Sequence, residues 1–380
     1  MLPFLLGVYS VAGMRVISTY TGAGGLDVGF HQAGAKAIAA CELDLSACKT
    51  YEANFKDVRL YKGRVSDALD DGFFDNLDGD VLIGGPPCQG FSVAGKMDPE
   101  DPRSLEIFNF LRVLERTQPR AFVMENVKAL ATLTKWEFVR ERVVRQSMRA
   151  GYTVKMLVLN SADFGVPQRR ERVFFVGFHA DGGGSRAAAA MASFLETLIT
   201  EEAEPPTIGS IVRNLGPAGS QGNARVCNAK VNFATNPIMR RSPYAGMLFN
   251  GAGRPLDANG ISSTLPASMG GNKTPIVDEV QIFDGGDSFV EKYHSRLQAG
   301  GGSMHGQAPA RLRRLTVDEC IAIQTFPADY TFEGSKSSVF KQIGNAVAPK
   351  MARAIATALR AGLEELCATP RVPKSRPSTA

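Results

Sequence analysis

Short apolar runs alternate with segments of helical periodicity from about residue 15 to residue 178. Runs of this kind are typical of buried strands, and the amphipathic segments between them are typical of crossover helices. The pattern predicts strands at 16–17, 37–40, 80–83, 120–124, 154–159 and 172–178. It predicts helices at 25–33, 44–54, 104–117 and 135–150. We therefore expect an α/β domain built on a doubly wound, mostly parallel sheet.

The pattern changes after residue 180. Gly, Pro, Asn and Ser become frequent and helical periodicity weakens, so we expect a second, smaller and loop-rich domain. Helical periodicity then returns at 315–323 and 350–366, which indicates that the chain finishes on the first domain. The predicted organisation is an N-terminal extension at 1–13, the first domain at 14–180, the second at 181–310, a return to the first at 311–367 and a loose tail at 368–380.

Composition narrows the class of protein. The chain has 380 residues, 44% of them hydrophobic and 21% charged, which is typical of a globular protein of two domains. Its six cysteines include no C-x-x-C pair and its four histidines have no ligand spacing, so we expect neither a disulfide framework nor a metal site. A net charge of +5 permits an anionic partner without requiring one. Without a membrane span or a secretion signal, we expect a cytoplasmic protein that does not contact a membrane.

A glycine-rich turn at 22–25 follows the first strand and precedes a helix. Glycine lets the backbone approach a ligand closely at the carboxyl end of a strand, where doubly wound sheets bind nucleotides. The dinucleotide fingerprint G-x-G-x-x-G fails because Asp27 occupies the third glycine position, which disfavours a nicotinamide cofactor. Glu42, at the end of the next apolar run, is placed to accept ribose hydroxyls. A nucleoside is the predicted ligand, and a tight turn beside a surface acid is the alternative.

Three further strand ends carry reactive side chains. Cys88 follows the strand at 80–83 and two prolines that stiffen the loop, and Glu125 follows the strand at 120–124. Arginines cluster at 169–172, before the last strand. Taken singly, a cysteine is more often a small buried hydrophobe and arginines are more often a solvated face. Together, a thiol, a carboxylate and guanidinium groups can converge where the sheet binds its nucleoside.

Six motifs, in order along the chain, resemble those of the cytosine 5-methyltransferase family, whose members move a methyl group from S-adenosylmethionine to carbon 5 of cytosine in DNA. They lie at 22–25, 86–92, 125–127, 168–172, 314–320 and 344–347. The resemblance covers 15–178 and 311–359, and it implies a catalytic methyltransferase domain with a Rossmann-like sheet. Residues 181–310 then fall where the family keeps its target-recognition domain.

The resemblance implies catalytic roles for Cys88, Glu125, Arg170 and Arg172. The Cys88 thiolate would add to carbon 6 of a cytosine flipped out of the duplex, which makes carbon 5 nucleophilic towards a methyl sulfonium. A protonated Glu125 would donate to ring nitrogen 3, so we expect its pKa to be raised. Arg172 would hold the base carbonyl oxygen, with Arg170 close by. Loss of the carbon 5 proton would then expel Cys88.

Cofactor and DNA contacts carry over from the same resemblance, with departures: Tyr20 stands where the family usually has Phe, and Ser18 where Asp is common. The implied S-adenosylmethionine-binding residues are Tyr20, Gly22, Ala23, Gly24, Gly25, Leu26, Glu42, Leu43, Asp67, Pro86, Leu105, Asn345 and Ala346. The implied DNA-binding residues are Gln89, Ser92, Lys96, Gln168, Arg240, Arg241, Thr264 and Lys273.

The sequence therefore predicts a DNA (cytosine-5-)-methyltransferase of bacterial or phage restriction-modification type. An RNA cytosine-5 methyltransferase is one alternative. Another is a catalytically inactive nucleic-acid-binding relative, which would have lost Cys88, Glu125 or Arg172, and none of these is lost. A nicotinamide-dependent oxidoreductase is a distant alternative, because Asp27 breaks its fingerprint. We expect a monomer that binds duplex DNA and shares its target with a cognate restriction endonuclease, with or without contact between the two.

Overall fold

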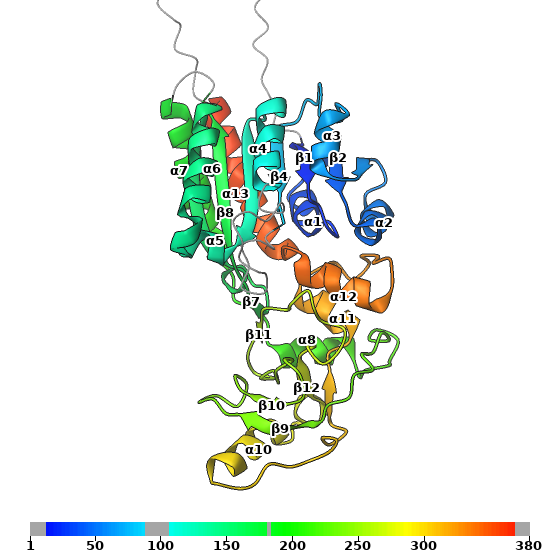
Figure 1. Cartoon of the computed structure of the whole chain (residues 1–380). Coiled ribbons are helices and arrows are strands. Elements are labelled where there is room, and N and C mark those ends of the chain that lie inside the picture. Colours follow the sequence, from blue (N-terminus) through cyan, green and yellow to red (C-terminus); the bar gives the residue numbers. More distant parts are fainter. Residues whose placement is uncertain (1–12, 88–105, 181–183, 369–380) are drawn as a thin grey trace, which may run out of the picture.

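The computed structural model describes residues 13–87, 106–180 and 184–368 (Figure 1). Five residues with predicted roles, Cys88, Gln89, Ser92, Lys96 and Leu105, lie outside the described residues. The described chain forms a larger domain built on a sheet and a smaller domain below it in the view of Figure 1. Within the described ranges, no helix is long and apolar enough to cross a bilayer.

A seven-stranded sheet in the order β3-β2-β1-β4-β5-β8-β6 forms the centre of the larger domain. Its strands are β1 (Arg15–Thr19), β2 (Lys36–Glu42), β3 (Arg59–Lys62), β4 (Val81–Gly84), β5 (Ala121–Val127), β6 (Tyr152–Asn160) and β8 (Glu171–His179). The pairs among β1 to β5 are parallel, whereas β8 runs antiparallel between β5 and β6. The predicted mostly parallel sheet is confirmed. Strand β3 was missed because its alternating sequence has no continuous apolar run.

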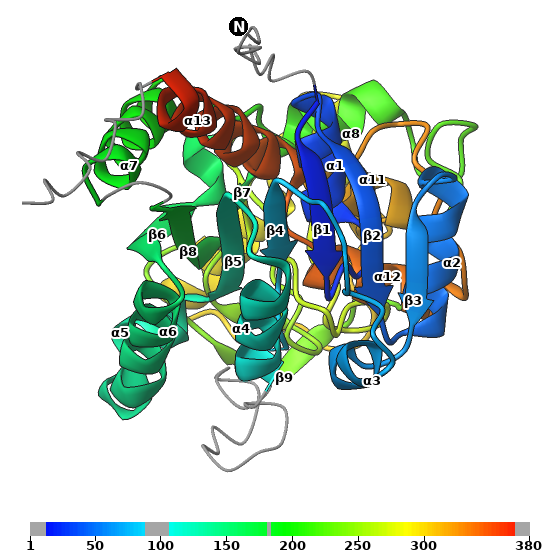
Figure 2. The ribbon, with the colours of Figure 1, turned by 90° about the horizontal axis from the view of Figure 1, so that it is seen from above.

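Helices cover both faces of this sheet, as a doubly wound fold requires (Figure 2). One face packs against α1 (Gly25–Gln32), α7 (Gly184–Thr200) and α13 (Pro349–Ala368). The other packs against α3 (Val65–Asp70), α4 (Glu106–Thr117), α5 (Lys128–Thr132) and α6 (Glu137–Arg149). Helix α2 (Leu45–Asn54) follows β2, and short 3-10 turns lie at Thr134–Trp136 and Ser161–Asp163.

Helix α7 lies in the core of the larger domain, although its residues follow the boundary expected at 181. Its side chains Ala190 and Phe194 are fully buried in the same apolar cluster as Phe178 of β8. A side chain at Gly362 of α13 would meet the ring of Phe178 at 2.4 Å, so the helix layer packs tightly. The change of composition after residue 180 therefore marks a connection within the larger domain rather than its end.

The smaller domain is loop-rich and has short elements. It contains α8 (Ile208–Leu215), β9 (Phe233–Ile238), β10 (Met247–Phe249), β12 (Ile276–Asp278), α9 (Glu279–Phe283), α10 (Phe289–Gln298), β13 (Leu312–Arg314), α11 (Val317–Ile323) and α12 (Lys336–Asn345). Strand β13 pairs with β12, and α11 and α12 share an apolar cluster with α8. Part of the segment expected to return at 311 thus packs with the smaller domain, and α13 completes the return.

Candidate active site

The glycine turn joins β1 to α1 at the carboxyl edge of the sheet, as the sequence predicts. Tyr20 and Gly22 both have φ of 54°, and Gly24 has φ of 78°, so the chain reverses through left-handed conformations. At Gly25 a side chain is excluded for a different reason, because its Cβ would lie 2.3 Å from the Val347 carbonyl oxygen. The turn is therefore built for close approach of backbone, both to the 346–347 segment and to a ligand at the open edge.

Glu42 holds the glycine turn from the side of β2. Its Oε2 accepts from the Gly22 N–H at 2.7 Å, and its Oε1 accepts from the N–H groups of Leu43 and Asp44 at 2.8 and 2.7 Å. Burial raises the pKa of this carboxyl, and the three N–H donors oppose that rise. Because a carboxylate has about four acceptor sites, capacity remains for a ligand hydroxyl.

Asp27, in the first turn of α1, forms buried hydrogen bonds beside the glycine turn, a structural role that the sequence did not reveal. Its carboxylate accepts from the Ser18 hydroxyl at 3.0 Å and from the Tyr51 hydroxyl at 2.9 Å. Burial raises the pKa of Asp27 to about 6. In the same region the Tyr330 hydroxyl donates to the Ala23 carbonyl, which ties the smaller domain to the turn. The residue that breaks the dinucleotide fingerprint is thus a structural acid.

Glu125 and Arg172 form an ion pair at the ends of β5 and β8. Arg172 lies opposite Val127 in the strand register, so its guanidinium reaches Glu125 diagonally, and Nε lies 3.0 Å from Oε1. Their side chains are only 15% and 12% exposed. Burial raises the pKa of Glu125, while the charges of Arg172 and Arg170 oppose that rise. The net direction agrees with the raised pKa that the sequence predicts.

The segment leading to Cys88 passes beside Glu125. Strand β4 ends at Gly84, and a side chain at Gly85 would come within 3.1 Å of Glu125 Oε2. The Asn126 amide donates to the Pro86 carbonyl oxygen at 3.1 Å, which ties the end of β5 to the proline pair. Residues 85 and 86 therefore lie beside the end of β5 and its Glu125 carboxyl. Cys88 itself lies outside the described residues.

Arg170 differs from Arg172 in what its guanidinium contacts. It is 3% exposed, and it donates to the carbonyl oxygens of Leu265 and Gly344 at 3.3 and 2.9 Å and of Asn345 at 3.4 Å. These contacts link the larger domain to the loop after β11 (Ser262–Ser263) and to the end of α12. The resemblance placed Arg170 close to Arg172 at the base, and in the structure the Arg170 guanidinium connects the two domains.

Gln168, predicted to contact DNA, has no exposed side chain in this structure, and nothing here supports that contact. It is fully buried in β7 (Gln168–Arg169), its amide donates to Gln324, and its oxygen accepts from the Leu265 N–H at 2.9 Å. Releasing it would leave buried polar groups without partners, which is costly. Polar character in a motif rich in arginine was a poor guide to exposure here.

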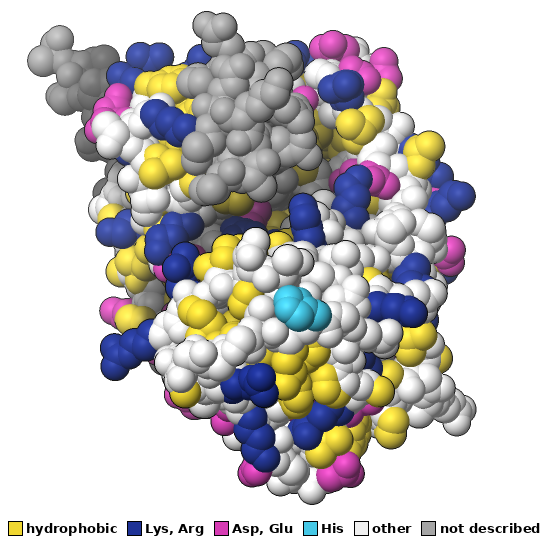
Figure 3. Space-filling view, turned by 60° about the horizontal axis from the view of Figure 1, so that its bottom comes forward, with side chains coloured by type: hydrophobic (Ala, Val, Ile, Leu, Met, Phe, Trp, Pro, Cys, Tyr) yellow, Lys and Arg dark blue, Asp and Glu magenta, His cyan; other side chains and the backbone are white. Residues whose placement is uncertain are grey.

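The other described DNA-binding predictions are exposed. Thr264 lies beside β7, where its hydroxyl donates to the Arg169 carbonyl oxygen at 2.8 Å. Arg240 and Arg241 occupy the turn between β9 and β10, and Lys273 lies in the loop before β12. Figure 3 views the molecule from the side of the smaller domain and shows several Lys and Arg side chains there. Their exposure permits phosphate contacts, and their role stays a prediction.

Most of the remaining predicted cofactor residues lie along the carboxyl edge of β1, β2 and β3. Leu43 is 55% exposed next to Glu42, and Asp67 is exposed in the first turn of α3. Asn345 is exposed at the end of α12, whereas Ala346 is buried. Ala23, Leu26 and Pro86 are also buried, so any contact from them would come from the backbone.

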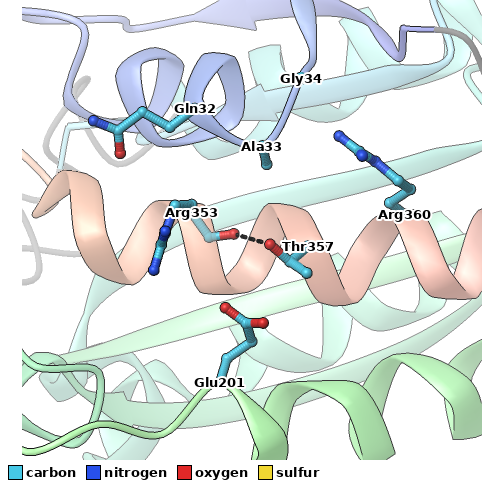
Figure 4. Close-up of a pocket in the computed structure, with 7 residues that line it drawn as sticks. All are labelled: Gln32, Ala33, Gly34, Glu201, Arg353, Thr357 and Arg360. Atoms are coloured by element: carbon cyan, nitrogen blue, oxygen red, sulfur yellow. Dashed lines mark hydrogen bonds between the residues drawn. The ribbon is translucent and has the colours of Figure 1, made fainter.

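A cavity of about 490 Å³ lies away from these residues, between the end of α1 and α13 (Figure 4). It is lined by Gln32, Ala33, Gly34, Glu201, Arg353, Thr357 and Arg360. The end of α1 leads into the start of β2, at the amino edge of the parallel strands, so this cavity is on the opposite edge from the glycine turn. Because the strand ends that carry Glu42 and Glu125 are elsewhere, we assign the site to the carboxyl edge.

Known proteins resemble the chain over nearly its whole length. A sequence model of the C-5 cytosine-specific DNA methylase family matches residues 14–361. The chain is 34% identical to the Type II methyltransferase M1.HphI of Haemophilus parahaemolyticus, over 94% of this chain and 90% of that protein. It is 29% identical to M.NgoPII of Neisseria gonorrhoeae, over 92% and 96%. The crystal structure of the S. pombe Dnmt2 methyltransferase has a TM-score of 0.60 and 17% identity, over 93% of this chain and 99% of that chain, which shows a shared fold.

Proposed function

Because the chain belongs to the C-5 cytosine-specific DNA methylase family, and is thus a DNA cytosine-5 methyltransferase, we propose that it methylates cytosine through a transient bond to Cys88. The target is a cytosine in a specific duplex sequence, flipped out of the stack so that Cys88 can reach carbon 6. The observation that carries this proposal is the buried Glu125–Arg172 ion pair beside the prolines that precede Cys88.

The glycine turn fits S-adenosylmethionine as the cofactor. A Cβ built on Gly22 meets no atom within 4 Å, so the turn leaves open space there, and Glu42 has acceptor capacity for a ribose hydroxyl. Leu43, Asp67 and Asn345 are exposed. When bound, S-adenosylmethionine supplies the electrophilic methyl group.

In the reaction, the Cys88 thiolate bonds to carbon 6 of cytosine while negative charge moves toward ring nitrogen 3. The raised pKa of Glu125 favours a protonated carboxyl that donates to this nitrogen. Arg172 pairs with Glu125 and orients it. In this mechanism Arg172 also holds the carbonyl oxygen of the base. Loss of the proton from carbon 5 restores the double bond and releases the thiolate.

The decisive experiment traps the bond to Cys88. A duplex with 5-fluorocytosine at the target lacks the carbon 5 proton, so wild-type protein with S-adenosylmethionine should form a complex that survives denaturation. Peptide mapping should place the bond on Cys88, and Cys88→Ser should form no complex while still binding S-adenosylmethionine. Cys367→Ser, which changes an exposed thiol, is the matched control. A trapped complex with Cys88→Ser, or none with an active wild-type preparation, would overturn the mechanism.

Target and partners are tested separately. Bisulfite sequencing of the genome of a host that lacks cytosine methylation, after expression of this protein, should reveal one methylated sequence. Labelling of RNA instead of duplex DNA would reverse the substrate assignment. We further propose that the chain acts as a monomer and protects the target of a cognate restriction endonuclease. A dimer in sedimentation at assay concentrations would contradict the monomer. DNA that the cognate endonuclease still cuts after methylation would contradict the protective role.

A further inference from the structure

Tyr20 holds an unfavourable backbone conformation at the start of the glycine turn. Its φ of 54° is left-handed, a region that bulky side chains rarely adopt. This conformation costs free energy and persists only where other contacts impose it. Tyr20 is one of four non-glycine residues with positive φ among the described residues. Gly22, two positions later, has the same φ without a side chain, whereas position 20 carries a tyrosine.

The Tyr20 side chain is fixed at its far end by Glu106, the first residue of α4. The hydroxyl donates to Glu106 Oε2 at 2.8 Å and also lies 3.0 Å from the Glu106 carbonyl oxygen. Burial raises the pKa of Tyr20, so the hydroxyl keeps the proton that it donates. The ring packs against the apolar cluster under α4. This hydrogen bond joins residues that are 86 positions apart in sequence.

Glu106 is in turn held in place by its own helix. The Asn109 amide donates to Glu106 Oε2 at 3.1 Å, and Arg112 donates to the Asn109 oxygen at 3.2 Å. Arg112 also pairs with Asp70 of α3 at 3.4 Å. The carboxylate that receives the Tyr20 hydroxyl is therefore part of a polar chain that connects α4 to α3.

Two carboxylates thus hold the glycine turn from opposite sides. In the sheet, β1 lies between β2 and β4. Glu42 ends β2 and binds the Gly22 N–H, while Glu106 begins the helix that follows β4 and binds Tyr20. Between them lies the backbone with open space at Gly22.

We propose that Glu106 is a positioning residue for the methyl donor: by holding Tyr20 it keeps the glycine turn in the conformation that binds S-adenosylmethionine. This inference rests on the proposed function of the turn. It assigns no contact between Glu106 and the donor, since Glu106 acts through the tyrosine hydroxyl. Without that hydrogen bond the turn relaxes toward conformations that Tyr20 prefers, and donor binding must restore the strained one.

The test measures the dissociation constant of S-adenosylmethionine by calorimetry, in the full chain without DNA. Tyr20→Phe removes only the hydroxyl, and we expect about five- to tenfold weaker binding, as for loss of one typical net hydrogen bond. Glu106→Ala should weaken binding by the same factor, whereas Glu106→Gln, which keeps an acceptor, should recover most of it. In turnover, the change should fall in the KM for the donor rather than in kcat.

A double-variant cycle and one control make the result decisive. If Glu106 acts through Tyr20, the double variant Tyr20→Phe with Glu106→Ala should bind no more weakly than either single variant. Tyr152→Phe is the control, because it also removes a tyrosine hydroxyl. That hydroxyl donates to the Pro119 carbonyl oxygen at 2.6 Å, and Tyr152 lies on β6, the last strand of the sheet. The variant should leave binding unchanged. Wild-type affinity in both Tyr20→Phe and Glu106→Ala, or multiplied losses in the double variant, would overturn the inference. Absence of binding by folded wild-type protein would instead contradict the proposed function.

Discussion

Arg172 Nε lies 3.0 Å from Glu125 Oε1, and this ion pair is largely shielded from solvent where β5 ends and β8 begins. Burial favours the neutral carboxyl and the neighbouring guanidinium favours the charged one, and burial is the larger effect. The pair therefore holds a carboxyl whose proton is available at higher pH than that of an ordinary glutamic acid. Such a group is suited to donate a proton during catalysis.

Replacing Glu125 with Gln should slow the chemical step severely while leaving duplex binding almost unchanged. The amide keeps the shape but cannot transfer a proton, and general-acid catalysis is typically worth about 10²- to 10⁴-fold. Single-turnover methylation and duplex titration measure the two effects. Because the pKa of Glu125 is raised, wild-type kcat should fall as pH rises through that pKa, and the variant should lack this decline.

Glu171→Gln is the matched control for that prediction. Glu171 lies on the neighbouring strand β8, but it is exposed and its carboxylate pairs with Lys128 at 2.6 Å. It should retain wild-type turnover. Equal loss of turnover and duplex affinity in Glu125→Gln would indicate a structural carboxyl instead of an acid.

We expect replacement of Arg170 to lower mainly the free energy of unfolding, and replacement of Arg172 to lower mainly the rate of methylation. Arg170→Met would leave the carbonyl oxygens of Leu265 and Gly344 without their buried donor, and we expect it to lower the free energy of unfolding by about 2–4 kcal/mol. Arg172→Met should lower turnover more than stability, because its partner is Glu125. Urea unfolding and single-turnover assays on both variants test this division, and a reversal of the two phenotypes would refute it.

Asp27 should make stability depend on pH. Its pKa is raised from 3.8 to about 6, so the folded state binds this proton more tightly than the unfolded chain does. The stabilisation is fully present below pH 3.8 and is lost as pH rises through about 6, with a magnitude of about 3 kcal/mol. Asp27→Asn should flatten this dependence in urea unfolding between these pH values.

Asp71→Asn provides the comparison for Asp27. Asp71 also accepts a tyrosine hydroxyl, that of Tyr61 at 2.5 Å, but the pair is exposed. It should retain the wild-type dependence on pH. If Asp27→Asn keeps the same slope as wild type, another group is responsible for it.

Arg240 should contribute to the salt dependence of DNA binding. It is exposed in the turn between β9 and β10, and a contact with one phosphate should change the slope of log K against log salt by about 0.9. Arg240→Ala should therefore bind with a shallower slope. Arg360→Ala, in the cavity on the opposite edge of the sheet, should keep the wild-type slope. An unchanged slope for Arg240→Ala would remove it from the phosphate contacts.

The positions of most strands along the chain, and the edge that carries the site, could be predicted because they depend on local patterns. Continuous apolar runs predicted β4 and β5, and the residues that follow them, including Glu125, necessarily lie at strand ends. The glycine turn was equally local, since left-handed φ at 22 and 24 favours glycine. The domain boundaries could not be predicted in this way, because they do not depend on local patterns. Helices α7 and α11 have ordinary amphipathic sequences, and nothing in them specifies which core they join.

By itself, the sequence determined the α/β class, the position of Glu125 and Glu42 at strand ends, and the place of the glycine turn, because periodicity and turn chemistry act between near neighbours. Only the tertiary structure decided which arginine faces Glu125, because that depends on the register of β8 against β5. It also decided that Gln168 is buried and that Tyr20 meets Glu106, since both follow from contacts between segments far apart in sequence. Such contacts depend on how whole elements pack, which no short pattern encodes.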